Sequence, residues 1–237
     1  MKICLIKQPS GIGDIFFLQK IAHVYREKGY KVLWPVRDDI FWISEYIDGV
    51  TWCKMSDDFP YKDMFQYAGM YESDEVVYID CQDADRTHSD GRIMSSKYSI
   101  AGLDYSDWQK YFKFNRKKDK EDELYYSVLG LTDDSVYAYV NDLYHTDIRE
   151  SDLLKDVCYN MDIVRNKIID GYTVFDWCKV YENASRINMI GTSISYVIDV
   201  LNLKVVNPDD YVYHARSEFI FNEVNYLFKK PMKMIWK

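Results

Sequence analysis

Two short turns, each placed between an apolar run and a helical pattern, carry the residue types best suited to chemistry. The first is GIGD, Gly11–Asp14, and the second is GTSIS, Gly191–Ser195. Glycine lets a ligand approach the backbone closely, and the start of the following helix offers unpaired N–H groups and a partial positive charge. At such turns a carboxylate could act as a general base, and clustered hydroxyl groups would suit a phosphate.

Each turn also has an interpretation without function. Asp14 could simply be a residue of the first helical turn that interacts favourably with the helix dipole, worth about 0.3–1 kcal/mol. Alternatively, it lies at the C-terminal edge of a parallel sheet, where open α/β folds bind ligands, and serves as a base. Thr192 or Ser193 could likewise be an ordinary helix cap. The residue types alone leave these alternatives open.

The first turn resembles part of the dinucleotide-binding fingerprint GxGxxG. Gly11 and Gly13 match its first two glycines, and Asp38 could bind a ribose. The third position holds the bulky Phe16, where close helix–strand packing requires a glycine. No recognisable Ser/Tyr/Lys catalytic set accompanies the turn. An NAD-dependent enzyme is therefore the less favoured alternative.

The elements that must position these turns alternate between apolar strands and amphipathic helices. In the first half we expect strands at 3–6, 31–36, 50–55 and 75–81, and helices after the first turn and over 38–47. In the second half we expect strands at 136–141, 160–166, 186–190, 203–207 and 232–236, and helices from Thr173, along 194–201 and near 219–228. Thr173 with Asp176 resembles a capping box. This rhythm predicts an α/β fold with parallel sheets that carry helices on their faces.

The most charged stretch is NRKKDKEDE, Asn115–Glu123, which contains no apolar residue. Such a run is typical of a solvated helix start or connector. It also lies near mid-chain, so it is the best candidate for a domain boundary. We therefore predict two domains of similar size, 1–118 and 119–237.

Composition narrows the function further. The net charge of −8 argues against general affinity for nucleic acid or an anionic membrane. The five cysteines are odd in number and scattered, which favours a reducing compartment. The N-terminal apolar run is too short for a signal peptide, and no stretch approaches about 20 apolar residues. The four histidines are too dispersed for a metal site. We expect a soluble cytoplasmic protein with no metal and no integral membrane segment.

Taken together, the two turns resemble segments of the heptosyltransferase-like glycosyltransferases, glycosyltransferase family nine and its GT-B relatives. The first turn is similar to that family's strand–glycine–aspartate–helix segment, roughly K-x-x-x-x-G-D-x-x. The second lies where the family places an Asp-Thr-Gly-x-x-His loop that holds the sugar nucleotide. The apolar strand, Thr192, the Ile194–Ser195 pair and the following helix match that segment, as does the lead-in at 175–185.

Three positions in the second turn depart from the family pattern. Gly191 stands where the family usually has aspartate, Ser193 replaces glycine, and Tyr196 replaces histidine. These departures put the nucleotide-binding details, and with them the donor, in doubt. The chain is also shorter than the bacterial members, as in a trimmed version encoded by a virus or a polysaccharide cluster.

The resemblance implies two Rossmann-like domains that face each other across a cleft, the acceptor binding mainly to the first and the nucleotide sugar mainly to the second. It implies a metal-independent glycosyltransferase that uses a nucleotide-activated donor and a glycan or other hydroxyl acceptor, with Asp14 as candidate general base. The implied donor-site residues are Gly191, Thr192, Ser193, Ser195 and Tyr196. Further donor-site candidates in the second half are Asn141, Arg149, Lys167 and Arg216. The acceptor or cleft candidates are Gly11, Gly13, Lys97 and Tyr98.

Two alternatives accompany this interpretation. Each candidate cation alone is more typical of an ordinary surface residue, and the aromatic residues of 92–98 and 104–114 are more typical of a core than of a sugar platform. Because fold alone does not give function, the chain could also be a non-catalytic nucleotide- or sugar-binding module.

Overall fold

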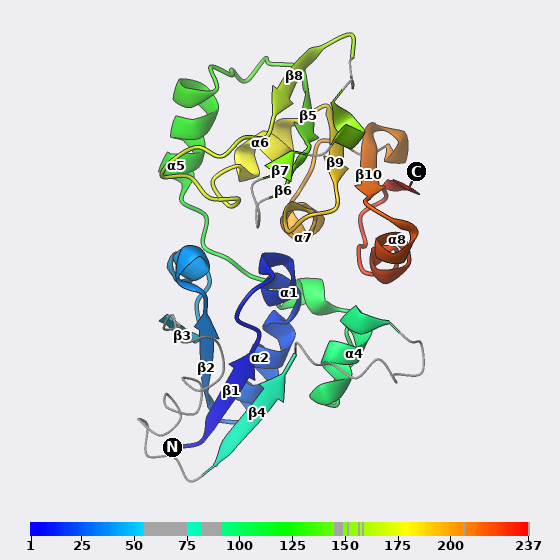
Figure 1. Ribbon diagram of the computed structural model, residues 1–237. Helices are drawn as coiled ribbons and strands as arrows, with labels where there is room; N and C mark the ends of the chain where they lie inside the picture. Colours follow the sequence, from blue (N-terminus) through cyan, green and yellow to red (C-terminus); the bar gives the residue numbers. More distant parts are fainter. Residues whose placement is uncertain are drawn as a thin grey trace. The chain divides into compact units, whose positions relative to one another are not determined.

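The computed structural model describes residues 1–54, 75–81, 92–144, 149–150, 152–155, 157, 159–205 and 207–236, with the side chains of 149 and 150 excluded. The chain forms two compact units, Met1–Asn115 and Arg116–Lys237. Figure 1 colours them from blue to green and from green to red. The division falls at the start of the charged stretch Asn115–Glu123.

The first unit contains a four-stranded parallel sheet with the order β3-β2-β1-β4. The arrows of β1, β2 and β4 point the same way in Figure 1. The strands are β1 (Ile3–Lys7), β2 (Lys31–Val36), β3 (Thr51–Lys54) and β4 (Val76–Asp80). Every residue of β1 is buried, because a central strand of a parallel sheet is covered on both faces. This accounts for its continuous apolar run.

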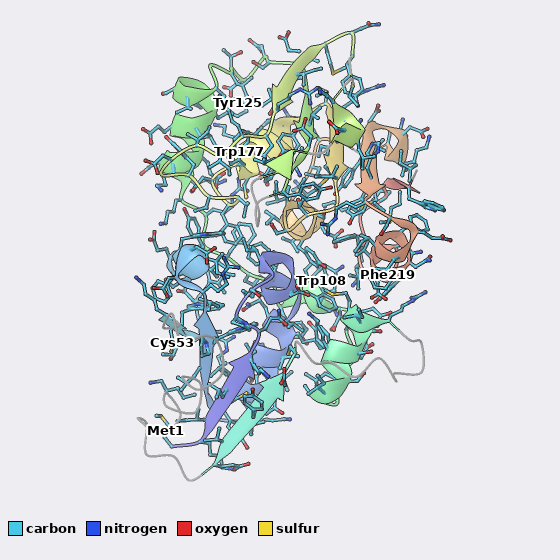
Figure 2. All side chains as sticks on the ribbon, viewed as in Figure 1. Met1, Cys53, Trp108, Tyr125, Trp177 and Phe219 are labelled. Carbon is cyan, nitrogen blue, oxygen red and sulfur yellow. The ribbon has the colours of Figure 1, made fainter. Side chains whose placement is uncertain are left out.

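The described part of the first unit also contains helices. They are α1 (Ile12–Phe17), α2 (Gln19–Glu27), the 3₁₀ helices η1 (Asp38–Glu45) and η2 (Trp108–Lys110), and α4 (Ile93–Ile100). The helix expected over 38–47 is thus a 3₁₀ helix. Aromatic side chains from the end of the unit pack into its core. Phe16 stacks on Phe112 with ring centroids 4.7 Å apart, and Trp108, labelled in Figure 2, is 1% exposed.

The second unit contains a five-stranded parallel sheet with the order β11-β10-β9-β5-β8. Numbered along the chain, this is the order 2-1-3-4-5, one of the two common arrangements of doubly wound α/β folds. The strands are β5 (Tyr137–Asn141), β8 (Asp162–Arg165), β9 (Arg186–Ile190), β10 (Tyr211–Ala215) and β11 (Lys233–Trp236). A separate antiparallel pair consists of β6 (Leu143–Tyr144) and β7 (Arg149–Glu150).

Short helices connect these strands. They are α5 (Lys118–Asp122), the π-helix η3 (Glu123–Val128), the 3₁₀ helices η4 (Asp152–Leu154) and η5 (Pro208–Asp210), α6 (Cys178–Asn183), α7 (Ile194–Val200) and α8 (Glu218–Val224). The core is again aromatic. Tyr139 packs on Tyr181 at 5.0 Å and on Trp177 at 6.2 Å between ring centroids, and Trp177 is labelled in Figure 2.

Two predictions for the second unit are wrong. The described residues of 203–207 form no strand: Lys204 donates its backbone N–H to Glu182, and the Asn207 side chain caps η5. The strand at this position in the chain is β10, whose residues were not predicted as a strand. The helix expected from Thr173 begins at Cys178. Asp176 instead accepts hydrogen bonds from the Thr173 backbone N–H and hydroxyl, at 2.7 and 3.0 Å, and holds 173–177 as turns.

The charged stretch is also less solvated than its composition suggests. Glu121 of α5 is 1% exposed. Its carboxylate accepts hydrogen bonds from Arg116, whose guanidinium also donates to Glu182 of α6 at 2.8 Å. A buried carboxylate requires such partners. The stretch therefore ties the first helix of the second unit to α6, and the interpretation as a purely solvated run is wrong for Glu121.

Two further findings concern the described residues. The four cysteines among them, Cys4, Cys53, Cys81 and Cys178, are buried free thiols. Within the same residues, no helix combines the length and the hydropathy that a membrane crossing would require.

Candidate active site

The strand order of the first sheet reverses between β1 and β4, because the chain adds β2 and β3 on one side of β1 and then adds β4 on the other side. Ligands of open α/β sheets bind outside the carboxyl ends of the strands at such a switch point. Both strands end there in a charged residue, Lys7 and Asp80, which are register partners. The Lys7 ammonium donates to the Asp80 carboxylate, and the Lys7 side chain is only 8% exposed. Burial alone would lower the pKa of Lys7, but the hydrogen bonds and charge interactions with Asp80 and Tyr78 together outweigh burial and raise that pKa above its ordinary value.

Asp14 reaches the same edge from the first turn of α1. Gly11 is the N-cap residue of this helix and has a left-handed backbone, with φ of 78°. A Cβ atom on Gly11 would lie 2.2 Å from Oδ2 of Asp14, so the carboxylate occupies the space that any other residue would fill. The other oxygen, Oδ1, accepts a hydrogen bond from Nζ of Lys97 at 2.6 Å. Lys97 also donates to Oε1 of Gln8 at 3.3 Å.

The structure therefore brings together three of the predicted residues, Gly11, Asp14 and Lys97. Gly13 lies beside them in the first turn of α1. Sequence reasoning missed Lys7 and Asp80 as site residues, together with Gln8. The available signal was position: Lys7 and Asp80 are charged residues at the C-terminal ends of two predicted strands.

Tyr98 does not face this edge as a sugar platform. Its side chain is fully buried, its hydroxyl donates to the backbone carbonyl of Phe17, and its ring packs edge-to-face on the Phe17 ring at 4.8 Å between centroids. A ring with no exposed face cannot stack on an acceptor. The expectation that Tyr98 contacts the acceptor is therefore wrong, and the core interpretation holds for this residue.

The strand order of the second sheet reverses between β5 and β9. Hydrogen bonds link two side-chain amides and a hydroxyl along the carboxyl ends of its strands. Asn166, directly after β8, donates from Nδ2 to Oδ1 of Asn141 at 2.8 Å. Asn141, the last residue of β5, donates from Nδ2 to Oγ1 of Thr192 at 3.2 Å. Asn141 is completely buried, whereas Thr192 is half-buried and follows β9 by two positions. Of the predicted donor-site residues, the structure brings Asn141 and Thr192 into direct contact.

The second turn requires a glycine at position 191, because the Tyr213 side chain lies close to the backbone there. A Cβ atom on Gly191 would lie 2.1 Å from the Tyr213 hydroxyl oxygen. Ser193 is the N-cap residue of α7, but its side chain accepts no capping hydrogen bond, so the interpretation of Ser193 as an ordinary cap is wrong. Ser195 is fully buried, and among the described residues its hydroxyl has no hydrogen-bond partner. Tyr196 is 7% exposed and packs edge-to-face on Phe228, which makes its ring part of the packing beneath the turn.

Two of the three predicted cations lie on loops that follow strands. Arg216 is exposed directly after β10, and its guanidinium lies over the Tyr144 ring, 5.1 Å from the centroid. Lys167 is exposed just after Asn166. Arg149 belongs to β7, and its side chain lies outside the described residues. Sequence reasoning missed Arg165, which donates to Asp142 at 2.5 Å beside the end of β5.

A cavity of about 420 Å³ lies elsewhere in the first unit, between α2 and the segment that ends the unit at Asn115. Two pairs of its polar lining groups contact each other: Arg26 lies 3.2 Å from Nδ1 of His23, and Asn115 donates to Asp48 at 2.6 Å. Neither Asp14 nor Lys97 lines it. This cavity does not belong to the β1–β4 edge.

Three solved structures resemble the whole chain. A family-nine glycosyltransferase from Veillonella parvula superposes with a TM-score of 0.62 and 8% identity over 100% of this chain and 86% of its own. The ADP-heptose LPS heptosyltransferase II of E. coli gives 0.57 and 10% over 99% and 90%. The iron-containing dodecameric glycosyltransferase TibC of enterotoxigenic E. coli gives 0.55 and 10% over 100% and 64%. The chain has a GT-B fold.

This likeness confirms the fold class that the two turns implied. No family model matches the sequence, and no curated protein does either. In the part of the chain that the structure describes, no group of three or more His, Cys, Asp or Glu side chains is arranged to hold a metal ion.

Proposed function

We propose that this protein transfers a sugar from a nucleotide-activated donor to a hydroxyl group of a glycan or another acceptor. One combination of observations supports the proposal: the chain has a GT-B fold, and the carboxylate of Asp14 lies at the carboxyl-end switch point of its first sheet. A carboxylate at that position is suited to remove a proton from an acceptor hydroxyl.

In the proposed reaction the acceptor hydroxyl loses its proton to Asp14, and its oxygen forms a bond to the anomeric carbon of the sugar. The bond between that carbon and the donor phosphate breaks, and the electron pair leaves with the nucleoside diphosphate. A positioned general base typically accelerates such a step about 10²- to 10⁴-fold. The leaving diphosphate requires hydrogen-bond donors or cations that stabilise its developing charge.

We assign the donor to the carboxyl edge of the second sheet. The supporting features are the Thr192 hydroxyl held by Asn141, and the exposed cations Arg216 and Lys167 on the loops that follow β10 and β8. We propose that these groups, rather than a metal ion, stabilise the diphosphate. Transfer should then persist unchanged in EDTA, and its loss on chelation with recovery on adding a divalent cation would contradict the metal-free reaction.

Binding of nucleotides tests the donor class. A thermal-shift panel of UDP, GDP, ADP, CMP and NAD⁺ should show stabilisation by at least one nucleoside diphosphate, since a ligand at about 100 times its Kd adds about 2.7 kcal/mol. Stabilisation by NAD⁺ alone would favour the dinucleotide alternative and refute the transferase.

Transfer itself separates an enzyme from an idle binding module. With the nucleotide sugar identified by the panel, the wild type should glycosylate a hydroxyl acceptor. Asp14→Asn should bind the nucleotide unchanged and lose about 10²- to 10⁴-fold in kcat. The matched control is Asp39→Asn, an exposed carboxylate of the same unit that pairs with Arg37, and it should have wild-type activity. Nucleotide binding without transfer by the wild type would identify a binding module instead.

A further inference from the structure

Lys97 is buried to a degree that is unusual for a lysine. It lies on α4, is 5% exposed, and directs its ammonium group to the carboxyl edge of the first sheet. Lysine is almost never fully buried unless it is paired, because an ammonium group loses its hydration on burial. The groups that compensate for the lost hydration of the Lys97 ammonium therefore indicate the role of this residue.

Two acceptors hold the Lys97 ammonium. One is Oδ1 of Asp14 at 2.6 Å, and the other is Oε1 of Gln8 at 3.3 Å. Gln8 is fixed in turn, because its Nε2 donates to the Ser10 carbonyl at 2.6 Å and its backbone carbonyl accepts from the Trp34 indole at 3.0 Å. The orientation of the Gln8 amide follows from this network, since only its oxygen can accept from an ammonium group. The Gln8 oxygen that accepts from Lys97 is therefore itself held in place by hydrogen bonds.

The pairing makes the two oxygens of Asp14 inequivalent. Oδ1 is occupied by Lys97. Oδ2 lies over Gly11, in the space that a Cβ atom would occupy, and among the described residues it has no hydrogen-bond partner. A general base needs a lone pair that is directed at the substrate and not already engaged. Oδ1 is already engaged by Lys97, so Oδ2 is the oxygen that can take the proton.

We propose that Lys97 is a positioning residue for transfer: it holds Oδ1 of Asp14 so that Oδ2 faces the acceptor hydroxyl. This inference rests on the proposed function. During transfer the hydroxyl proton moves to Oδ2, and no proton moves to or from Lys97. Asp14 and Lys97 are 83 positions apart in sequence and lie on different helices. The orientation of the Asp14 carboxylate therefore depends on the packing of α4 against α1.

A merely structural ion pair would give different results. In that case the loss of Lys97 would lower stability, and its effect on kcat would add to that of losing Asp14. A positioning residue acts through its partner, so its effect on kcat disappears once the partner is gone. The two roles are therefore separable by a double-mutant cycle.

The experiment compares Lys97→Met, Asp14→Asn and the double variant with Lys20→Met as matched control. Lys20 is also a buried lysine of the first unit, 9% exposed, and its ammonium donates to Asp107 at 2.5 Å and to the Asp104 backbone carbonyl rather than to Asp14 or Gln8. We expect Lys97→Met to lose about 10- to 100-fold in kcat, with unchanged nucleotide affinity, and to lose nothing further in the Asp14→Asn background. Lys20→Met should lower Tm without a comparable loss of kcat. Lys97→Arg, which keeps the charge, should recover part of the rate.

The outcomes distinguish this inference from the proposed function. Loss of kcat in Asp14→Asn but not in Lys97→Met, or additive losses in the double variant, would overturn the positioning role and leave Asp14 as the base. Wild-type kcat in Asp14→Asn would overturn both roles. A readout independent of activity is the ¹⁵N NMR signal of the Lys97 ammonium, which should shift in Asp14→Asn and stay in place in Asp39→Asn. An unchanged signal in Asp14→Asn would refute the ion pair itself.

Discussion

Replacing Gly11 with alanine should disturb the candidate base directly, because the new methyl group would take the place of the Asp14 carboxylate. The ideal Cβ position on Gly11 lies 2.2 Å from Oδ2, 3.2 Å from Cγ and 3.5 Å from Cβ of Asp14. Two heavy atoms cannot approach to 2.2 Å, so the carboxylate must rotate away. Rotation breaks its 2.6 Å hydrogen bond with the buried Lys97 ammonium.

Two costs contribute to the loss of stability. The left-handed backbone at Gly11, with φ of 78°, costs a residue with a Cβ atom about 1–2 kcal/mol. Displacement of the carboxylate leaves a buried ammonium short of a partner, which costs about 1–3 kcal/mol more. We therefore expect Gly11→Ala to lower the free energy of unfolding by about 2–5 kcal/mol.

Gly29 offers a matched control for the backbone term. It lies in the same unit, has φ of 84°, and a Cβ atom there would meet nothing within 4 Å. Gly29→Ala should therefore show only the cost of the left-handed backbone. The difference between the two variants, measured by urea unfolding, isolates the collision with Asp14.

A second variant tests whether Asp14 is the group displaced. In an Asp14→Ala background no carboxylate occupies the space above Gly11, so Gly11→Ala should cost no more than Gly29→Ala. In the otherwise wild-type chain, Gly11→Ala should also lose sugar transfer while Gly29→Ala keeps it. Equal stability losses for Gly11→Ala and Gly29→Ala in the wild-type background would refute the reasoning.

Other predictions concern the second unit and the buried thiols. Gly191→Ala should lower Tm because its Cβ would lie 2.1 Å from the Tyr213 hydroxyl oxygen, and Tyr213→Phe should restore part of the loss; no rescue would contradict this. Glu121→Gln should cost about 1.5–3 kcal/mol in urea unfolding, because Glu121 is buried and bound by Arg116. Burial raises the pKa of Cys81 from 9.0 to about 12, so the unfolded chain releases this proton first, and this thiol should contribute a fall in stability of up to about 1.4 kcal/mol per pH unit as pH rises from 9 to 12. Cys81→Ala should flatten that fall, and an unchanged urea midpoint profile would contradict the assignment.

The regular strands could be predicted because their burial is continuous. The runs at 3–6 and 31–36 are apolar over nearly their whole length, and the run at 186–190 is apolar at three of its five positions. They form β1, β2 and β9 within one residue at each end. Such runs arise because a central parallel strand is covered on both faces. Length and apolar content were therefore sufficient evidence.

The missed strand has a different pattern. In β10 the buried residues Tyr211, Tyr213 and Ala215 alternate with half-buried ones, and the aromatic side chains replace the aliphatic run that marks the other strands. The run at 203–207 contains two valines and attracted the prediction, but its backbone bonds to the end of α6 through Lys204. Tertiary packing overrode local preference at both places.

Contacts within the candidate site were predictable only where its residues are local, although Lys97 was among the predicted acceptor-side residues. Asp14 follows from one turn, because glycine, helix start and carboxylate lie within four positions of each other. Lys97 and Asp80 reach the same edge from distant segments, and nothing in the sequence around them specifies Asp14 or Lys7 as partners. That information lies in the strand order: once β4 rather than β3 lies beside β1, Asp80 must stand next to Lys7. The helix that follows β4 in the described chain then supplies the buried lysine. The topology, more than any motif, thus determines which groups surround the Asp14 carboxylate. Substitutions that alter the packing of α4 should therefore change the orientation of this carboxylate, even where the substituted residue does not contact Asp14.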